Sequence, residues 1–525
     1  MRFNYKILGL VMFVMLICCV SAASAADADN ITVPDDADVI EIDEAVDSVD
    51  AVESESSECT IEEPTLPTRS NSITLNETNY TTKFNNDGVF NDANVDEVIF
   101  VGNFNNSTYN TLKFNQAITI TATGSTFTNV GFGLHSNGIV LNGATIIMNA
   151  PAYSNCYAID LQNANHAIVI NNKINYTCTA DNEANYNFAI KAGNSENLTI
   201  YGNEINASVP LKQPNWDIYG SIYSDYVAGV AIEYCNNLKF DKNNLTVIGN
   251  KRVGDFPTLD AFIIAKSSDA KIRGNIIRES DIVTTTNQYS YIYGIDVYTC
   301  ENLLICSNNV IMNGNISNTD YEGNGTGAAY CIQLTGPHTG VKICNNNLTT
   351  KNQGPNLGIY SQNYDDDTQL TISGNNITVT GKAGSDPWSL VSGMELQDTN
   401  ATVYGNNIVV NNTNPYTSGD YAFGISYCQP TSSYHYYYIY QNNVTVYNGN
   451  YTIYIIGADN GLVEHNNLEA DNGTAVNTGN ITVNVPSSIT VGPNPWIIFV
   501  EVILFISTLT YWFLWIKVYY HCLLF

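Results

Sequence analysis

Charged residues are scarce in this 525-residue chain, and basic residues are the scarcest of them. Asp, Glu, Lys and Arg make up 13% of the sequence, and 20 basic residues stand against 50 acidic ones, so the net charge is −30. Binding to phosphate backbones requires clustered Lys and Arg, so this balance argues against nucleic acid as a partner. Solubility must come from uncharged polar side chains instead, and the chain contains 72 Asn and 35 Tyr.

The sequence also lacks the local motifs of cofactor and metal sites. Its twelve Cys show no CxxC or zinc-ligand spacing and its six His are scattered, which argues against zinc or copper. No nucleotide motif is present, so no cofactor is expected. Ca²⁺ remains to be considered, because Asp365, Asp366 and Asp367 form an acidic loop that could hold it. A solvated loop without metal is the alternative interpretation.

The N-terminal end is typical of a secreted protein. Arg2 and Lys6 precede an apolar run and then small residues, which predicts a signal peptide at residues 1–26. Between positions 27 and 63 there are 15 Asp or Glu and no Lys or Arg. A segment of this composition repels itself, so we expect residues 27–69 to be a disordered acidic linker.

The C-terminal end contains a long apolar run. It covers residues 496–516, is interrupted only by Glu501 and a few Ser and Thr, and with 21 residues is long enough to cross a bilayer. Trp residues lie toward its two ends, as interface anchors do. We expect a transmembrane anchor here, between a linker at 491–495 and a short tail at 517–525. A frameshifted or truncated gene is the alternative.

A short motif recurs ten times between the two ends. Each copy has an apolar residue, two variable residues, an Asn, one further residue and a second apolar residue, as in ISGNNI at Ile372. Neighbouring copies are 24 to 40 residues apart. The shared asparagines are Asn172, Asn203, Asn243, Asn275, Asn308, Asn346, Asn375, Asn406, Asn442 and Asn466.

The apolar residues around each motif are spaced so that the chain must turn a corner. In LTISGNNITVT the step from Ile372 to Ile377 is five, so a straight strand would place the two on opposite faces. A corner keeps both on one side. Stacked coils of this kind bury a continuous core and place equivalent Asn side chains ~4.8 Å apart, within hydrogen-bonding reach. We expect irregular first coils at 70–150 and regular repeats at 151–490.

The repeated I-x-x-N-N-I with its G-I-x-L strands resembles the right-handed parallel β-helix repeat of pectate-lyase-like proteins. The Asn-rich version behind a signal peptide and an acidic leader is similar to the adhesin-like surface proteins of methanogenic archaea. The resemblance covers roughly residues 70 to 490. It implies an all-β, right-handed, single-stranded parallel β-helix on the extracellular face of the cell, anchored in the membrane, and we expect a monomer.

Polysaccharide lyases and hydrolases share this scaffold, so an enzyme is an alternative. The Arg-x-Pro-x-x-Arg pattern of pectate lyases is absent, as are the Gly-His-Gly and Arg-Ile-Lys patterns of polygalacturonases. Arg273 follows an inward Ile and should point outward, which makes it the one weak candidate for a catalytic base or a sugar-carboxylate clamp. Solvated surface charge is the other interpretation. The basic cluster around it is formed by Lys251, Arg252, Lys266, Lys271, Arg273 and Arg278, and Asp255, Asp260 and Asp269 lie among them.

Tyrosine is the residue type that best suits a binding surface. Its ring offers apolar area and a hydroxyl at low entropic cost, which fits sugar stacking or protein contact, although Tyr also shields sheet backbone. The segment SSYHYYYIY is dense in it, and Tyr404 and Tyr440 share an outward position beside the shared Asn. The expected ligand contacts are Tyr404, Tyr434, Tyr436, Tyr438 and Tyr440.

Two covalent features are also expected. Cys306 and Cys344 occupy the same motif position on neighbouring coils, so a disulfide between them is feasible. Two thiols are the alternative if the habitat is anaerobic. Nineteen N-x-S/T sequons make glycosylation of loops plausible.

The sequence favours a non-catalytic, adhesin-like surface protein that binds glycans or cell-surface proteins of other cells. A secreted polysaccharide lyase or hydrolase is the first alternative, and a passive structural protein of the cell envelope is the second.

Overall fold

The computed structural model describes the chain at residues 59–150, 155–178, 187–212, 228–253, 257–281, 290–317, 328–362, 369–384, 390–414, 421–428, 436–449, 451–456, 460–471 and 490–491. Within these residues the regular structure is β-strand apart from one short 3₁₀ helix, η1 (Tyr80–Lys83). Among the described residues, no helix has the length and apolar character needed to cross a membrane. The expected signal peptide, most of the acidic linker, the anchor and the tail lie outside the described residues.

Fourteen strands pair in parallel to form what we call the first stack. The strands are short because each one lies between two corners. They are β1 (Ser72–Leu75), β2 (Glu97–Phe100), β4 (Thr119–Thr121), β6 (Val140–Asn142), β9 (Ile168–Ile170), β12 (Thr199–Tyr201), β15 (Lys239–Asp241), β18 (Lys271–Arg273), β21 (Leu304–Cys306), β24 (Val341–Cys344), β27 (Gln369–Ser373), β30 (Asn400–Tyr404), β33 (Tyr436–Tyr440) and β36 (Asn460–Glu464).

The other strands form two further parallel stacks, which share β3 and β5. The second stack begins directly after the shared Asn of each repeat. It contains β3 (Asn103–Phe114), β5 (Thr126–Leu134), β7 (Thr145–Ala150), β10 (Lys173–Cys178), β13 (Glu204–Lys212), β16 (Asn244–Val253), β19 (Ile276–Asp281), β22 (Asn309–Ser317), β25 (Asn347–Gln353), β28 (Asn376–Gly381), β31 (Asn407–Asn412), β34 (Asn443–Tyr447) and β37 (Asn467–Ala470).

The third stack follows the second in every coil. It consists of parts of β3 and β5, then β8 (Cys156–Gln162), β11 (Asn187–Glu196), β14 (Ala228–Asn236), β17 (Thr258–Ala265), β20 (Tyr291–Tyr298), β23 (Ala329–Thr335), β26 (Asn356–Gln362), β29 (Val391–Gln397), β32 (Ala422–Cys428), β35 (Tyr451–Ile456) and β38 (Thr490–Val491).

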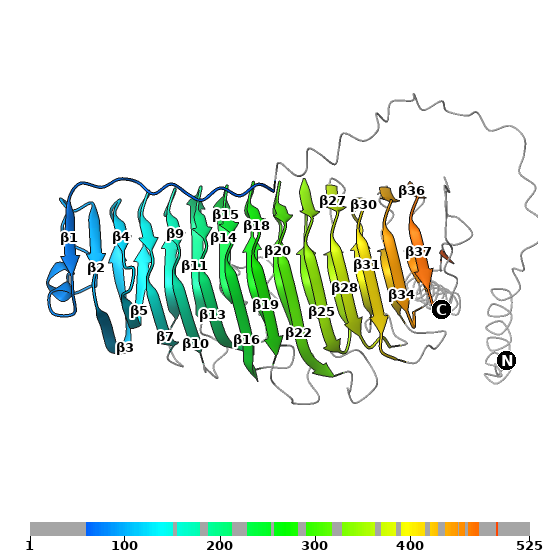
Figure 1. The fold of residues 1–525 in the computed structure, drawn as a ribbon, viewed down its shortest axis with the longest axis horizontal. Helices are drawn as coiled ribbons and strands as arrows, with labels where there is room; N and C mark the ends of the chain where they lie inside the picture. The colour runs from blue at the N-terminus through cyan, green and yellow to red at the C-terminus, as the bar shows by residue number, and fades with distance from the viewer. Residues whose placement is uncertain are drawn as a thin grey trace, which may run out of the picture. The chain divides into compact units, whose positions relative to one another are not determined.

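One coil therefore takes a strand from each stack in turn. β27 leads through the corner at Gly374 and Asn375 into β28, β29 follows, and β30 returns to the first stack one coil further on. Figure 1 shows the coils side by side in chain order, from blue to orange. Parallel pairing of successive coils confirms the expected fold class, a parallel β-helix.

The inward side chains form one continuous apolar core. Ile272, Ile305, Ile343 and Ile372 are register partners on four successive coils, and all four are completely buried. Burying an aliphatic side chain of this size contributes roughly 1.5–3 kcal/mol. In the irregular first coils, phenylalanine side chains fill the same space. The rings of Phe104 and Phe127, for example, stack with their centroids 4.8 Å apart.

Residues 59–69, which we call the strap, lie across the outside of the first stack. The dark-blue trace in Figure 1 crosses one edge of successive coils in this way. At one end Cys59 forms a disulfide with Cys306 of β21, and at the other Arg69 donates to Thr119 Oγ1 (3.1 Å) and to the Gly138 carbonyl (3.2 Å). The ten steps between Cys59 and Arg69 span ~30 Å in an extended chain, which matches six strand spacings of ~4.8 Å between β21 and β4. Part of the segment expected to be a linker is thus attached to the solenoid.

Candidate functional site

The ten corners share one backbone conformation. The residue before each shared Asn has a φ between 53° and 64°, in the left-handed region. Gly occupies this position in the ISGNNI corner as Gly374, but Lys242, Ser307, Gln441 and His465 occupy it elsewhere. The left-handed residue therefore precedes the shared Asn, and only this single residue of each corner has to adopt that conformation.

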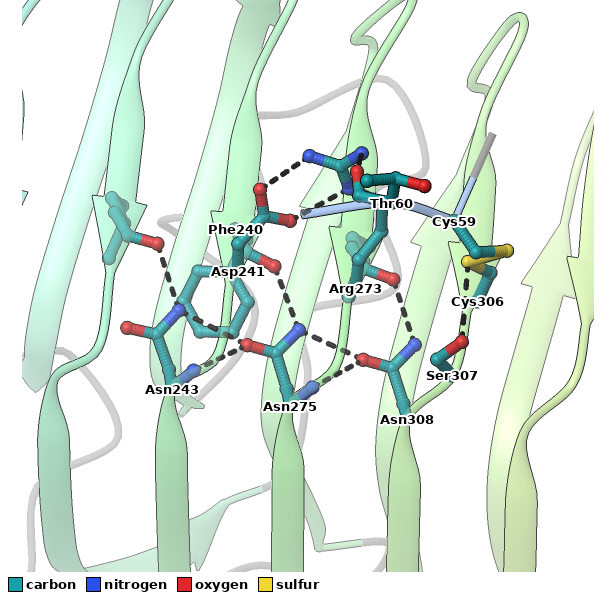
Figure 2. A network of polar contacts seen from close by, with 12 residues as sticks. Cys59, Thr60, Phe240, Asp241, Asn243, Arg273, Asn275, Cys306, Ser307 and Asn308 are labelled. Atoms are coloured by element: carbon teal, nitrogen blue, oxygen red, sulfur yellow. Dashed lines mark hydrogen bonds and ion pairs between the residues drawn. A yellow bond between two sulfur atoms is a disulfide. The ribbon is translucent and has the colours of Figure 1, made fainter. Parts of the chain in front are cut away.

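The shared asparagines form a buried asparagine ladder, part of which Figure 2 shows. Asn275 Nδ2 donates to Asn308 Oδ1 on the next coil (2.9 Å) and to the carbonyl of Phe240 on the previous one (2.8 Å). Its Oδ1 accepts from the backbone N–H of Asn243 (2.8 Å). The same pattern repeats from Asn172 to Asn466. These side chains satisfy the corner backbone, which is a structural role.

A second, exposed asparagine ladder lies next to the buried one. From Asn347 onward, each amide nitrogen in it donates to the Oδ1 of the Asn one coil earlier, at 2.8–3.0 Å. Its members are Asn309, Asn347, Asn376, Asn407, Asn443 and Asn467. Three of these, Asn347, Asn376 and Asn443, are also sequons. An amide has two donors and two acceptor lone pairs, so each side chain keeps hydrogen-bonding capacity beyond the ladder.

Arg273 points outward as expected, but it is only 6% exposed. Its Nη2 and Nε bond both carboxylate oxygens of Asp241 (2.6 and 3.1 Å), and its Nη1 donates to the carbonyl of Thr60 in the strap (2.7 Å). Figure 2 shows this group lying directly above the buried asparagine ladder. A guanidinium held in this way is a poor proton acceptor, so the geometry favours a role in holding the strap over catalysis.

The structure does not gather the basic cluster at one site. Lys266 follows β17 of the third stack and pairs with Glu233 (3.2 Å), whereas Arg273 belongs to the first stack. Arg278 belongs to the second stack, where its Nη1 donates to Asn244 Oδ1 (2.8 Å). Residues that are near in sequence lie on different faces because the chain turns corners between them.

The disulfide of the structure differs from the expected one. Cys306 is bonded to Cys59, which lies 247 residues earlier, and not to Cys344. Cys344 is the register partner of Cys306 on the next coil, and its sulfur lies 3.7 Å from that of Cys59. The sulfurs of all three lie within 4.8 Å of one another. Sequence reasoning missed Cys59 because its position carries no motif.

Tyrosines gather on the last coils of the first stack. The rings of Tyr404 and Tyr440 are half-buried and stack in parallel, with centroids 5.1 Å apart and planes 4° apart. Tyr438 is 43% exposed, and the centroid of its ring lies 5.3 Å from that of the Tyr436 ring. Tyr434 lies outside the described residues, and so do Asp365, Asp366 and Asp367.

The sequence analysis did not predict that Asp260 and Asp296 would form a carboxyl pair on the outward side of the third stack. Asp260 of β17 and Asp296 of β20 are fully buried, and none of their four carboxyl oxygens accepts a well-formed hydrogen bond from another described residue. The two carboxyl groups interact with each other, and burial beside a like charge favours the protonated form of at least one of them. Burial raises the pKa of Asp296 to about 7; burial, and then the Asp296 charge, raises the pKa of Asp260. The sequence signal that could have indicated this pair is an acidic residue within an otherwise apolar strand, such as Asp260 in TLDAFIIA.

Comparisons with known proteins give little further information. No protein-family model and no curated protein sequence matches the chain. Among solved structures, the crystal structure of PfbA, a surface adhesin of Streptococcus pneumoniae, aligns with 72% of this chain and 84% of that chain, at 11% identity and a TM-score of 0.37. The assignment of the fold therefore rests on the strand pairings described above.

Proposed function

We propose that this protein is a non-catalytic, adhesin-like surface protein that attaches to uncharged glycans on other cells. It is secreted through the signal peptide at residues 1–26 and held at the cell surface by the apolar run at 496–516. Binding takes place at what we call the corner surface, formed by Tyr404, Tyr438, Tyr440, Asn407 and Asn443. The stacked pair of Tyr404 and Tyr440 is the observation that carries this proposal.

Two tyrosine rings one coil apart form a parallel stack that gathers apolar area and hydroxyls at one place on the outside of the first stack. Their planes differ by only 4°, and the exposed ring of Tyr438 lies on the same outward side of β33 as Tyr440. Sugar rings present flat C–H faces that pack against aromatic rings, while their hydroxyls need hydrogen-bonding partners. Asn407 and Asn443 supply such groups directly across the corner, because each follows its tyrosine by three residues. The five side chains carry no charge, which favours a neutral ligand.

The test is a glycan and polysaccharide array probed with the full-length chain, reading retained binding together with released reducing or unsaturated ends. Replacing both Tyr404 and Tyr440 by Ala should weaken binding roughly tenfold or more. Tyr447→Ala is the matched control, because Tyr447 is 42% exposed but lies at the far end of β34.

Each other outcome contradicts the proposal in a different way. Released ends would show a polysaccharide-acting enzyme. Absence of binding to every glycan and to whole cells would favour a passive envelope protein. Equal loss in the double variant and in the Tyr447 control would move the binding site away from the corner surface.

A further inference from the structure

Three sulfur atoms from three separate segments meet beneath the strap. Cys59 belongs to the strap, Cys306 to β21 and Cys344 to β24. Cys306 and Cys344 are buried, and Cys59 is half-buried against them. The disulfide joins the sulfurs of Cys59 and Cys306, and the Cys344 sulfur lies 3.7 Å from that of Cys59.

The arrangement has the size of a thiolate metal site. Zinc–sulfur bonds of ~2.3 Å in tetrahedral geometry place the sulfurs ~3.8 Å apart. Cys59 and Cys344 already have this separation, at 3.7 Å, and all three sulfurs lie within 4.8 Å of one another. When the bond between Cys59 and Cys306 is reduced, those two sulfurs move apart to van der Waals contact, which brings the triangle closer to the required shape.

We propose that in the reduced chain Cys59, Cys306 and Cys344 bind one thiophilic divalent cation of the zinc class. A dithiol or phosphine reductant supplies the two electrons that break the disulfide, is itself oxidised, and leaves two thiols. Cation binding then releases the three thiol protons, because thiolates are the ligands. Three protein sulfurs leave the fourth tetrahedral position to water. The strap is thus fastened to the solenoid by a disulfide under oxidising conditions and by a metal under reducing ones.

Two of the five other described cysteines, Cys235 and Cys300, compete poorly for the cation. Burial raises the pKa of Cys235 to about 12 and that of Cys300 to about 12, so both stay protonated at neutral pH. They lie apart from one another on the inner side of different coils, and no other group of three metal-ligating side chains was found among the described residues. Charge-transfer absorption from thiolate ligands should therefore report on the sulfurs of Cys59, Cys306 and Cys344.

The experiment is a metal titration of the full-length chain, stripped of metal and reduced under anaerobic conditions. Co²⁺ is added first, because thiolate-to-cobalt charge-transfer absorption reports sulfur ligands directly, and Zn²⁺ is then used to displace it. We expect one Co²⁺ per chain. Cys344→Ser should bind at least about a hundredfold more weakly, while Cys344→His, which keeps a ligand, should recover most of the affinity. Cys235→Ala is the matched control and should bind as the unchanged chain does.

Folding of the variant is checked independently. Under oxidising conditions Cys344→Ser should keep the disulfide between Cys59 and Cys306, seen by mass spectrometry of its peptides. Equal Co²⁺ affinity and equal charge-transfer intensity in the unchanged chain and in a correctly cross-linked Cys344→Ser would overturn the proposal. The result does not depend on glycan binding, so the two proposals fail or succeed separately.

Discussion

At the scale of single residues, the corner depends on one left-handed position. Chirality makes this conformation cost roughly 1–2 kcal/mol for a residue with a side chain. Gly avoids that cost, and several corners use it, but Lys242, Ser307, Gln441 and His465 adopt a positive φ without being Gly or Asn. The surrounding ladder of hydrogen bonds must therefore hold these residues in place.

Replacing Gln441 by Gly should stabilise the protein. Relief of the left-handed strain exceeds the added flexibility of the unfolded chain, for a net gain of about 0.5–1 kcal/mol. The gain is measured as a higher urea midpoint of unfolding. As control, Thr445→Gly in the neighbouring strand β34 should lower the midpoint, because there Gly only loses strand propensity. A lower midpoint for both variants would contradict this account of the corner.

At the scale of the structural element, two asparagine ladders run along the same edge with opposite directions. The buried one donates toward the next coil and the exposed one toward the previous coil. Asn375 and Asn376 are neighbours in sequence and belong one to each ladder. The Asn375 side chain is buried and also bonds backbone groups, whereas the Asn376 side chain is exposed and bonds only neighbouring Asn side chains, so the two substitutions compare a buried with an exposed ladder position.

Asn375→Ala should destabilise the protein by about 3 kcal/mol, measured by urea unfolding. It leaves the backbone N–H of Asn346 and the carbonyl of Ile343 buried without the partners that Asn375 now provides. Asn376→Ala should cost less than about 1 kcal/mol, because water can replace its exposed partners. Similar losses from the two substitutions would mean that burial of the ladder contributes little.

At the scale of the whole molecule, buried carboxyl groups make stability depend on pH. Asp296 holds a proton in the folded state up to about pH 7, whereas the unfolded chain loses it near pH 4. The folded state therefore binds more protons across this window, and its stability falls as pH rises through it. Burial also raises the pKa of Glu395 to about 7, with the same sign. His338 acts in the opposite direction, since burial lowers its pKa to about 4.

Asp260→Asn should flatten this dependence. The substitution removes the proton that the folded state holds on Asp260, where burial and then the Asp296 charge raise the carboxyl pKa, so the unfolding free energy should fall less between pH 5 and pH 8. The difference from the unchanged chain should be on the order of 2–4 kcal/mol over that range. His338 is present in both proteins and cancels in the comparison. Asp87→Asn, at an exposed position, should leave the slope as it is, and an unchanged slope in Asp260→Asn as well would mean that the folded state holds no extra proton on Asp260 in this range.

The strap also acts on the whole molecule, because it joins distant coils. The bond between Cys59 and Cys306 closes a loop with a sequence separation of 247, and a cross-link over such a loop contributes roughly 2–5 kcal/mol. It also keeps Thr60 above Arg273, which completes the hydrogen bonding of a buried ion pair. Removing one partner of such a pair is costly because the other charge stays buried.

The sequence by itself determined the repeat, its corners and the direction in which its side chains point. These are local properties: the step of five between Ile372 and Ile377 requires a corner, and ten corners in register require stacking. Only the tertiary structure decided what lies on the outside of the coils. Cys59 meets Cys306 and Cys344, and Asp260 meets Asp296, through contacts between coils or between the leader and the coils. Apolar periodicity specifies the inner face of a solenoid, but it does not specify which polar residue faces which on the outer one.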